Sequence, residues 1–213
     1  MHRMNEPTLK TASSAEELAN YLLNQARFPE GAKILEIGCQ DGRILAAIAR
    51  RRPDLHFSGV DENQGNLTTA RAHLPEGQFA LATLAEQLPL QGPYDRIFSY
   101  GIAQQFNSLQ FVEWNERLSR CLLPRGTLHH FGIPNARQSF QFMMQKWQNQ
   151  TGRVLGTVLG GANGIISKWT HKYNATSYWH DPEVVQGSLQ HLGTVQLRIP
   201  ADTWYHFDVK IIP

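Results

Sequence analysis

Hydrophobic and polar positions follow two alternating patterns over most of the chain. Short apolar runs of strand length are followed by stretches in which apolar residues recur at helical spacing. The expected strands are residues 33–37, 55–60, 78–82, 94–100 and 127–131, and the expected helices are residues 15–26, 42–51, 64–74, 108–122 and 138–148. Strands that alternate with helices at these distances predict βαβ units and a parallel sheet.

The last quarter of the chain follows a different pattern. Asp181 is expected to cap a helix that begins at Pro182 and runs to about His191. Two strands are then expected, residues 195–199 and 203–211. Two adjacent strands with a short link predict an antiparallel hairpin at one edge of the sheet.

Within the second strand of this hairpin, apolar and polar residues alternate. The odd positions from Tyr205 to Ile211 are expected to face a core, and the even positions His206, Asp208 and Lys210 to face solvent. Together, these elements predict an α/β fold, a Rossmann-like three-layer sandwich. Its seven-stranded sheet should be mostly parallel, with a C-terminal antiparallel hairpin.

Length and composition limit the classes of protein that fit. The 213 residues suit one domain, with a helical leader over residues 1–30. The formal net charge of +2 gives no electrostatic footprint for nucleic acid or an anionic membrane. Two cysteines are too few for a disulfide framework or a zinc site. The first ten residues carry no apolar run after their charges. A soluble, cytoplasmic protein without a metal site is therefore expected.

The turn after the first strand, EIGCQDGR at residues 36–43, carries the clearest chemical signal. A P-loop needs GxxxxGK[ST], and a dinucleotide-binding turn needs GxGxxG; this turn has neither spacing. The pattern [ED]xGxGxG remains. Glu36, Gly38 and Gly42 match it, and Gln40 replaces the middle glycine.

This pattern, with its strand and helix, resembles the class I S-adenosylmethionine-dependent methyltransferases. Asp61 ends the second strand, 19 residues after Gly42, where that family carries a ribose-binding acid. Three further stretches resemble the family: LAEQLP at residues 84–89, YDRIFSYGIAQQF at residues 94–106 and LLPRGTLHHF at residues 122–131. The resemblance covers about residues 30–212.

The resemblance implies a binding site for S-adenosylmethionine. Asp61 is expected to accept the ribose hydroxyls, and Glu36 to favour the cationic methionine end. Gly38 and Gly42 are expected to let the backbone approach the ligand closely. The adenine ring is expected to be bound by backbone groups near Ala85 and by apolar contacts. The candidate cofactor contacts are Glu36, Gly38, Gln40, Gly42, Asp61, Leu84, Ala85 and Tyr100.

Two positions depart from the family's pattern. Gln40 carries a side chain where many members have none, and it either narrows the pocket or contacts the methionine carboxylate through its amide. Leu84 stands where members often have an Asp that bonds the adenine amino group. These departures keep a second interpretation open, a catalytically degenerate methyltransferase-fold subunit that acts as a binding or regulatory module.

The end of the fourth strand, SYGIAQQF, indicates the class of acceptor. It lacks the [DN]PP[YF] motif of methyltransferases that act on the amino groups of adenine or glutamine. It is more similar to small-molecule and lipid or quinone methyltransferases, although a protein substrate stays open. Positioning alone accelerates methyl transfer, and a general base is needed only for hydroxyl or carbon acceptors. Oxygen is the expected acceptor atom, ahead of nitrogen or carbon.

His130, at the end of the fifth strand, and Tyr173 are the candidate catalytic residues. Ligands of open α/β sheets lie beyond the carboxyl ends of the strands, which favours His130, although a packed strand histidine is the alternative. Weaker candidates are His129, His171 and His180. Residues 150–180 combine glycines, an apolar run and aromatic residues. They are expected to cover an apolar or aromatic acceptor, with a homodimer contact as the alternative.

Overall fold

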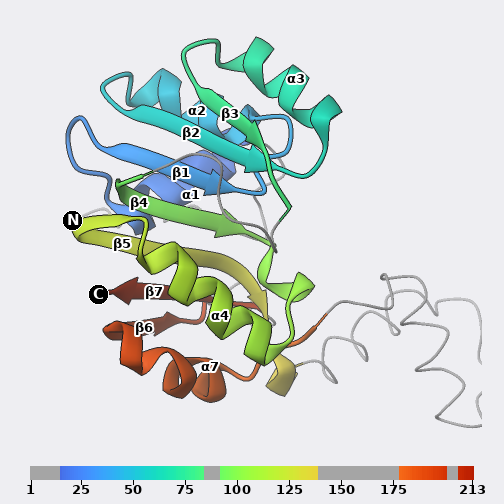
Figure 1. The fold of residues 1–213 in the computed structure, drawn as a ribbon, viewed down its shortest axis with the longest axis vertical. Coiled ribbons are helices and arrows are strands. Elements are labelled where there is room, and N and C mark those ends of the chain that lie inside the picture. Colours follow the sequence, from blue (N-terminus) through green and yellow to red (C-terminus); the bar gives the residue numbers. More distant parts are fainter. Residues whose placement is uncertain (1–14, 84–91, 139–177, 201–205) are drawn as a thin grey trace, which may run out of the picture.

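A single mixed sheet organises the chain. The computed structural model describes residues 15–83, 92–138, 178–200 and 206–213. Within them, seven strands pair in the order β3-β2-β1-β4-β5-β7-β6 (Figure 1). The strands are β1 (Lys33–Ile37), β2 (His56–Asp61), β3 (Gln78–Leu81), β4 (Tyr94–Tyr100), β5 (Leu122–Pro134), β6 (Thr194–Arg198) and β7 (His206–Ile212). β1 to β5 pair in parallel, whereas β7 is antiparallel to both β5 and β6. The predicted sheet and C-terminal hairpin are confirmed.

Helices cover both faces of the sheet. The described helices are α1 (Ala15–Ala26), α2 (Arg43–Arg51), α3 (Gln64–His73), α4 (Ser108–Ser119) and α7 (Pro182–Leu189), with short 3₁₀ turns η1 (Ala103–Gln105), η2 (Ala136–Gln138) and η3 (Gln190–Leu192). One core cluster joins α1, α2 and α3 to the sheet, and a second joins α4 and α7 to its other side. In Figure 1, α4 lies in front of the sheet and α1 behind it. The three-layer sandwich is therefore confirmed.

Side-chain caps fix where several helices begin. The Asp181 side chain accepts hydrogen bonds from the N–H groups of Glu183 and Val184, with Pro182 in the first turn, as predicted. At α4, Asn107 and Gln110 form a reciprocal capping box. α4 ends at Ser119, three residues earlier than predicted, because the chain turns there into a longer β5 than expected. The predicted helix at residues 138–148 lies almost wholly outside the described residues.

The prediction that Asp208 faces solvent is wrong. Asp208 is buried, and its carboxylate accepts hydrogen bonds from the Tyr21 hydroxyl and, at 3.0 Å, from the Gly132 N–H. The alternating pattern of β7 was interpreted as that of a strand with one exposed face. β7 instead lies inside the sheet between β5 and β6, and α1 supplies a buried hydrogen-bond donor on the supposedly exposed face.

The described helices include none that is both long and apolar enough to cross a membrane.

Candidate functional site

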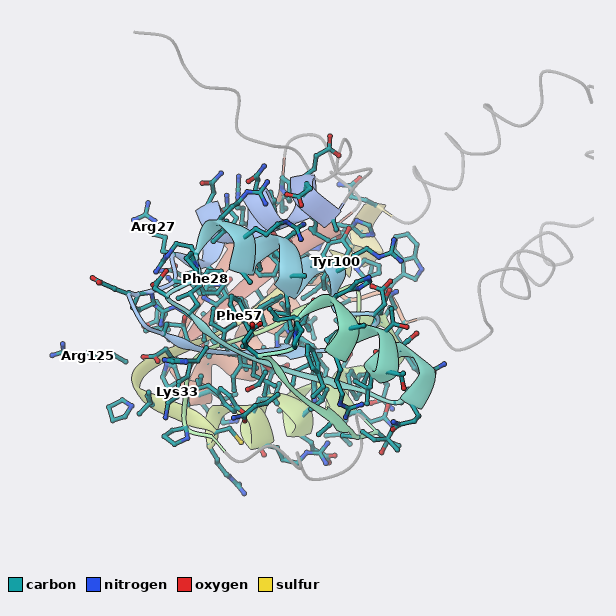
Figure 2. The ribbon with its side chains drawn as sticks, turned by 90° about the horizontal axis from the view of Figure 1, so that it is seen from above. Arg27, Phe28, Lys33, Phe57, Tyr100 and Arg125 are labelled. Carbon is teal, nitrogen blue, oxygen red and sulfur yellow. The ribbon has the colours of Figure 1, made fainter. Side chains whose placement is uncertain are left out.

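A cavity of about 290 Å³ lies at the carboxyl ends of β1 and β4. Its lining includes four predicted cofactor contacts: Glu36, Gly38, Gln40 and Tyr100. Figure 2 shows Tyr100 at the opposite end of the sheet from Lys33, the first residue of β1. The cavity therefore occupies the edge where ligands of open α/β sheets bind.

The turn that forms one wall of the cavity is built from left-handed residues. Gly38, Gln40 and Gly42 have φ angles of 74°, 48° and 71°. Backbone N–H groups of Gly38 and Cys39 donate to the Val60 carbonyl at 2.8 and 3.0 Å, which ties the turn to β2. A left-handed conformation costs a residue with a side chain about 1 kcal/mol. The motif's preference for glycine where Gln40 stands thus has a conformational cause.

The space beside the two glycines is filled by the chain itself. A Cβ at Gly38 would collide with the Ile102 side chain, and a Cβ at Gly42 would lie 2.8 Å from the Ala70 Cβ. Both positions favour glycine for their φ angles, and Gly42 also needs it for packing, because the Ala70 Cβ and backbone cannot easily move aside. Their predicted close approach to a ligand stays a prediction.

Asp61 connects the turn to the start of α3. Its Oδ2 accepts the Gln40 N–H at 2.9 Å, and its Oδ1 accepts the Asn63 N–H and the Asn66 side-chain amide, both at 3.0 Å. The carboxylate ends β2 and is 8% exposed. Asp61 thus holds the turn in shape and offers a nearly buried negative charge beside the cavity.

Glu36 has a buried carboxyl oxygen without a partner. The side chain is 1% exposed, and Oε2 has no hydrogen-bond partner within the described residues. Burial raises the pKa of Glu36 to about 8, and the negative charges of Asp61 and Asp41 add to the effect. A buried acceptor left unpaired is costly unless a ligand or proton satisfies it.

Two lining residues come from α1, a segment that the sequence did not connect with the site. Ala15 and Leu18 reach the cavity from one face of that helix. Their spacing of three residues places them on a common helical face, but nothing local indicates what that face covers. Ion pairs from Glu16 to Arg50 and Arg51 join α1 to α2.

His130 lies in the core under α4. Its Nε2–H donates to Asn115 Oδ1 and its Nδ1 accepts from the Ser99 hydroxyl, both at 2.8 Å. The imidazole packs against the rings of Phe111 and Trp114. Burial lowers the pKa of His130 to about 3, with a smaller effect from His180. Because both ring nitrogens are engaged, the geometry favours the packed role over the catalytic one.

His180 lies where β4 and β5 end. Its backbone N–H donates to the Pro134 carbonyl at 2.9 Å, and its Nε2–H donates to the Ala103 carbonyl at 3.0 Å. Nδ1 is buried and has no partner within the described residues. By sequence, His180 is only a weaker catalytic candidate. The structure gives a buried imidazole whose pKa is lowered by burial, with one ring nitrogen that no described residue engages.

Three candidates stay predictions. Leu84, Ala85 and Tyr173 fall outside the described residues, as does most of the 150–180 segment. Among the weaker candidates, His129 is buried and its Nε2 lies 2.7 Å from Thr127 Oγ1. Within the described chain, Glu36, the turn and Tyr100 come together at one cavity, with Asp61 hydrogen-bonded to its wall. His130 does not join them.

Comparisons with known proteins agree with this geometry. Residues 34–126 match a family model described as a methyltransferase domain. The chain is 35% identical over 133 residues to a trans-aconitate 2-methyltransferase of Delftia acidovorans, covering 61% of this chain and 46% of that protein. It is 30% identical over 121 residues to a malonyl-[acyl-carrier protein] O-methyltransferase of Priestia megaterium, covering 55% and 43%. The matches thus span about half the length of these curated relatives.

The solved structures include neighbours of the same fold. A magnesium protoporphyrin IX methyltransferase from Synechocystis PCC 6803, crystallised with bound SAH, aligns over 92% of this chain and 79% of its own. The TM-score is 0.60 and the sequence identity 13%, so this likeness concerns the fold alone. The family model, which spans the glycine turn, Asp61 and β4, carries the stronger evidence.

Proposed function

We propose that the chain is a class I S-adenosylmethionine-dependent methyltransferase and that it transfers a methyl group from S-adenosylmethionine to a small organic acceptor. The observation that carries the proposal is the cavity at the ends of β1 and β4. It is lined by the left-handed turn and by Glu36, one of whose carboxyl oxygens has no partner among the described residues. A buried carboxyl of this kind suits a ligand that brings a cation.

The residues around the cavity fit the chemistry of this cofactor. Glu36 would face the α-ammonium group of the methionine end. A carboxylate offers about four acceptor positions. Asp61 uses three of them within the chain, which leaves one for a ribose hydroxyl. When bound, S-adenosylmethionine supplies an electrophilic methyl group on its sulfonium. Leu84 and Ala85 are proposed to contact adenine.

The acceptor is proposed to lie beyond the ends of β4 and β5, next to the cofactor. Its methylated atom is proposed to be oxygen. The name of the Priestia relative specifies an O-methyltransferase, and the name of the Delftia relative specifies trans-aconitate, a carboxylate. A carboxylate acceptor is already ionised at neutral pH and needs no general base. The engaged nitrogens of His130 are compatible with such an acceptor.

An acceptor screen tests the proposed activity. The protein is incubated with S-adenosylmethionine and a panel of small di- and tricarboxylic acids, aromatic hydroxyl compounds and amines. Formation of S-adenosylhomocysteine is measured against Asp61→Ala, which should show reduced turnover. Turnover with the acids alone supports a carboxylate oxygen, whereas turnover with the aromatic compounds supports the apolar cover predicted for residues 150–180. Cofactor binding without turnover on any acceptor would favour the degenerate binding module.

A further inference from the structure

Glu36 occupies a buried position at which a negatively charged carboxylate is unfavourable. It lies in β1, paired in register with Gly59 of β2 and Phe98 of β4, at the inner wall of the cavity. The side chain is 1% exposed, and Oε2 has no hydrogen-bond partner within the described residues. A carboxylate with one oxygen in such a place loses hydration at that oxygen without a compensating donor.

The groups that face Glu36 do not supply a compensating cation. β2 contributes Asp61 and the turn contributes Asp41, which are both acids, so they add negative charge. The turn also contributes Cys39, a buried thiol whose pKa is raised by burial and which is therefore neutral. β4 contributes Tyr100, whose phenol carries no positive charge in either protonation state. α1 contributes Ala15 and Leu18, neither of which is titratable.

The basic side chain in the described cavity lining already forms an ion pair with another acid. Arg43, in the first turn of α2, pairs with Asp41, and its side chain is 67% exposed. A guanidinium that is mostly in water and paired with another acid compensates a buried charge poorly. Apart from Arg43, the described residues that line the cavity are therefore acids, neutral groups and apolar side chains.

We propose that Glu36 is protonated in the empty site and releases its proton when the α-ammonium group of the cofactor docks against it. The inference rests on the proposed function and concerns the same site. The neutral carboxylic acid of the free protein and the ammonium of the ligand are replaced by a carboxylate–ammonium ion pair. One O–H bond of Glu36 breaks, and its proton passes to solvent. Glu36 thereby selects ligands that bring a cation to this point.

The release of the Glu36 proton on ligand binding has a predicted magnitude that can be measured. Burial and the neighbouring acids raise the pKa of Glu36 to about 8 in the empty protein. At pH 7 about nine in ten molecules then hold the proton, so binding should release about 0.9 proton per ligand. The apparent affinity should rise about ninefold from pH 6 to pH 7 and about fivefold from pH 7 to pH 8, and then level off.

Titration calorimetry with S-adenosylhomocysteine tests the coupling without turnover. The titration is repeated at pH 7 in several buffers of different ionisation enthalpy, and the slope of the observed enthalpy against that quantity counts the released protons. The wild-type protein should release about 0.9 proton per ligand bound. Glu36→Gln keeps the shape of the side chain but has no proton to release. This variant should release close to zero protons per ligand bound. Protons that come from the ligand itself would appear equally in both proteins.

Two controls separate Glu36 from general effects. Glu76→Gln removes an exposed carboxyl outside the cavity lining and should release protons like wild type. 5′-Methylthioadenosine, which lacks the amino-acid end of the cofactor, should bind wild type without releasing the proton. This second control needs no variant, so it holds even where Glu36→Gln fails to fold.

The outcomes are distinct. Wild-type release near 0.9 that disappears with Glu36→Gln or with 5′-methylthioadenosine supports the inference. Tight binding of S-adenosylhomocysteine with no proton release by wild type overturns it and leaves the proposed function standing. No binding of S-adenosylhomocysteine at millimolar concentration overturns the proposed function, and this inference with it.

Discussion

The buried carboxyl of Glu36 should make the stability of the ligand-free protein depend on pH. Its pKa is about 8 in the folded protein, against an ordinary value of 4.5. Because the folded-state pKa is raised, the folded protein keeps a proton that the unfolded chain loses. The resulting stabilisation is fully present below pH 4.5 and is lost as the pH rises through 8.

The magnitude follows from the same two values. Between them, each pH unit changes the contribution of Glu36 to the free energy of unfolding by up to about 1.4 kcal/mol. From pH 5 to pH 8 wild type should lose about 3.5 kcal/mol relative to Glu36→Gln, which does not titrate at this position. Urea denaturation of both proteins at pH 5, 6, 7 and 8 measures the difference, in which contributions from other groups cancel.

Glu76→Gln serves as the surface control. The difference between its free energy of unfolding and that of wild type should stay constant over this pH range. The reasoning would be refuted if the free energies of unfolding of wild type and Glu36→Gln also differed by a constant amount, within about 0.5 kcal/mol, from pH 5 to pH 8. It would mean that Glu36 is hydrated or paired in solution, and that it has no proton to release on cofactor binding.

Three further predictions concern the site and the core. Asp61→Ala should weaken S-adenosylhomocysteine binding by about 1–3 kcal/mol in titration calorimetry, since it removes a charged acceptor; unchanged affinity would exclude its ribose role. Gln40→Gly should stabilise the protein by up to about 1 kcal/mol in urea denaturation by relieving the left-handed conformation, and a loss would mean that the side chain has a role of its own. His130→Ala should cost about 2–4 kcal/mol of stability by leaving Ser99 and Asn115 unpaired in the core, whereas lost turnover at full stability would restore a catalytic role.

The elements that could be predicted were those whose signals are local. β4 at Tyr94–Tyr100 and β1 at Lys33–Ile37 have the predicted bounds, because a short apolar run between turn residues needs no distant partner to be recognised. The cap at Asp181 is equally local, since the side chain bonds the N–H groups two and three residues ahead.

The environments of single polar residues could not be predicted in the same way. Asp208 is buried because α1, 187 residues earlier, brings the Tyr21 hydroxyl to it. His130 points into the core because Ser99 and Asn115, on other elements, engage both of its nitrogens. Periodicity gives the face of a strand but not what covers that face.

The glycine turn lies between these two cases. Its motif and the distance to Asp61 carry the resemblance to the class I methyltransferases, and residues 34–126 match a methyltransferase domain model. The hydrogen bond from the Gln40 N–H to Asp61 explains how a residue other than glycine is held in the left-handed region. That compensation depends on the end of β2 lying beside the turn, which only the folded chain shows.

Equilibrium binding of S-adenosylmethionine to the wild-type protein tests the central claim most directly. The account predicts saturable binding with one site and a Kd in the micromolar range, about 8 kcal/mol of binding free energy, as measured by titration calorimetry. Absence of binding at millimolar S-adenosylmethionine would contradict it, because the cavity at Glu36 and Asp61 would then not be a cofactor site.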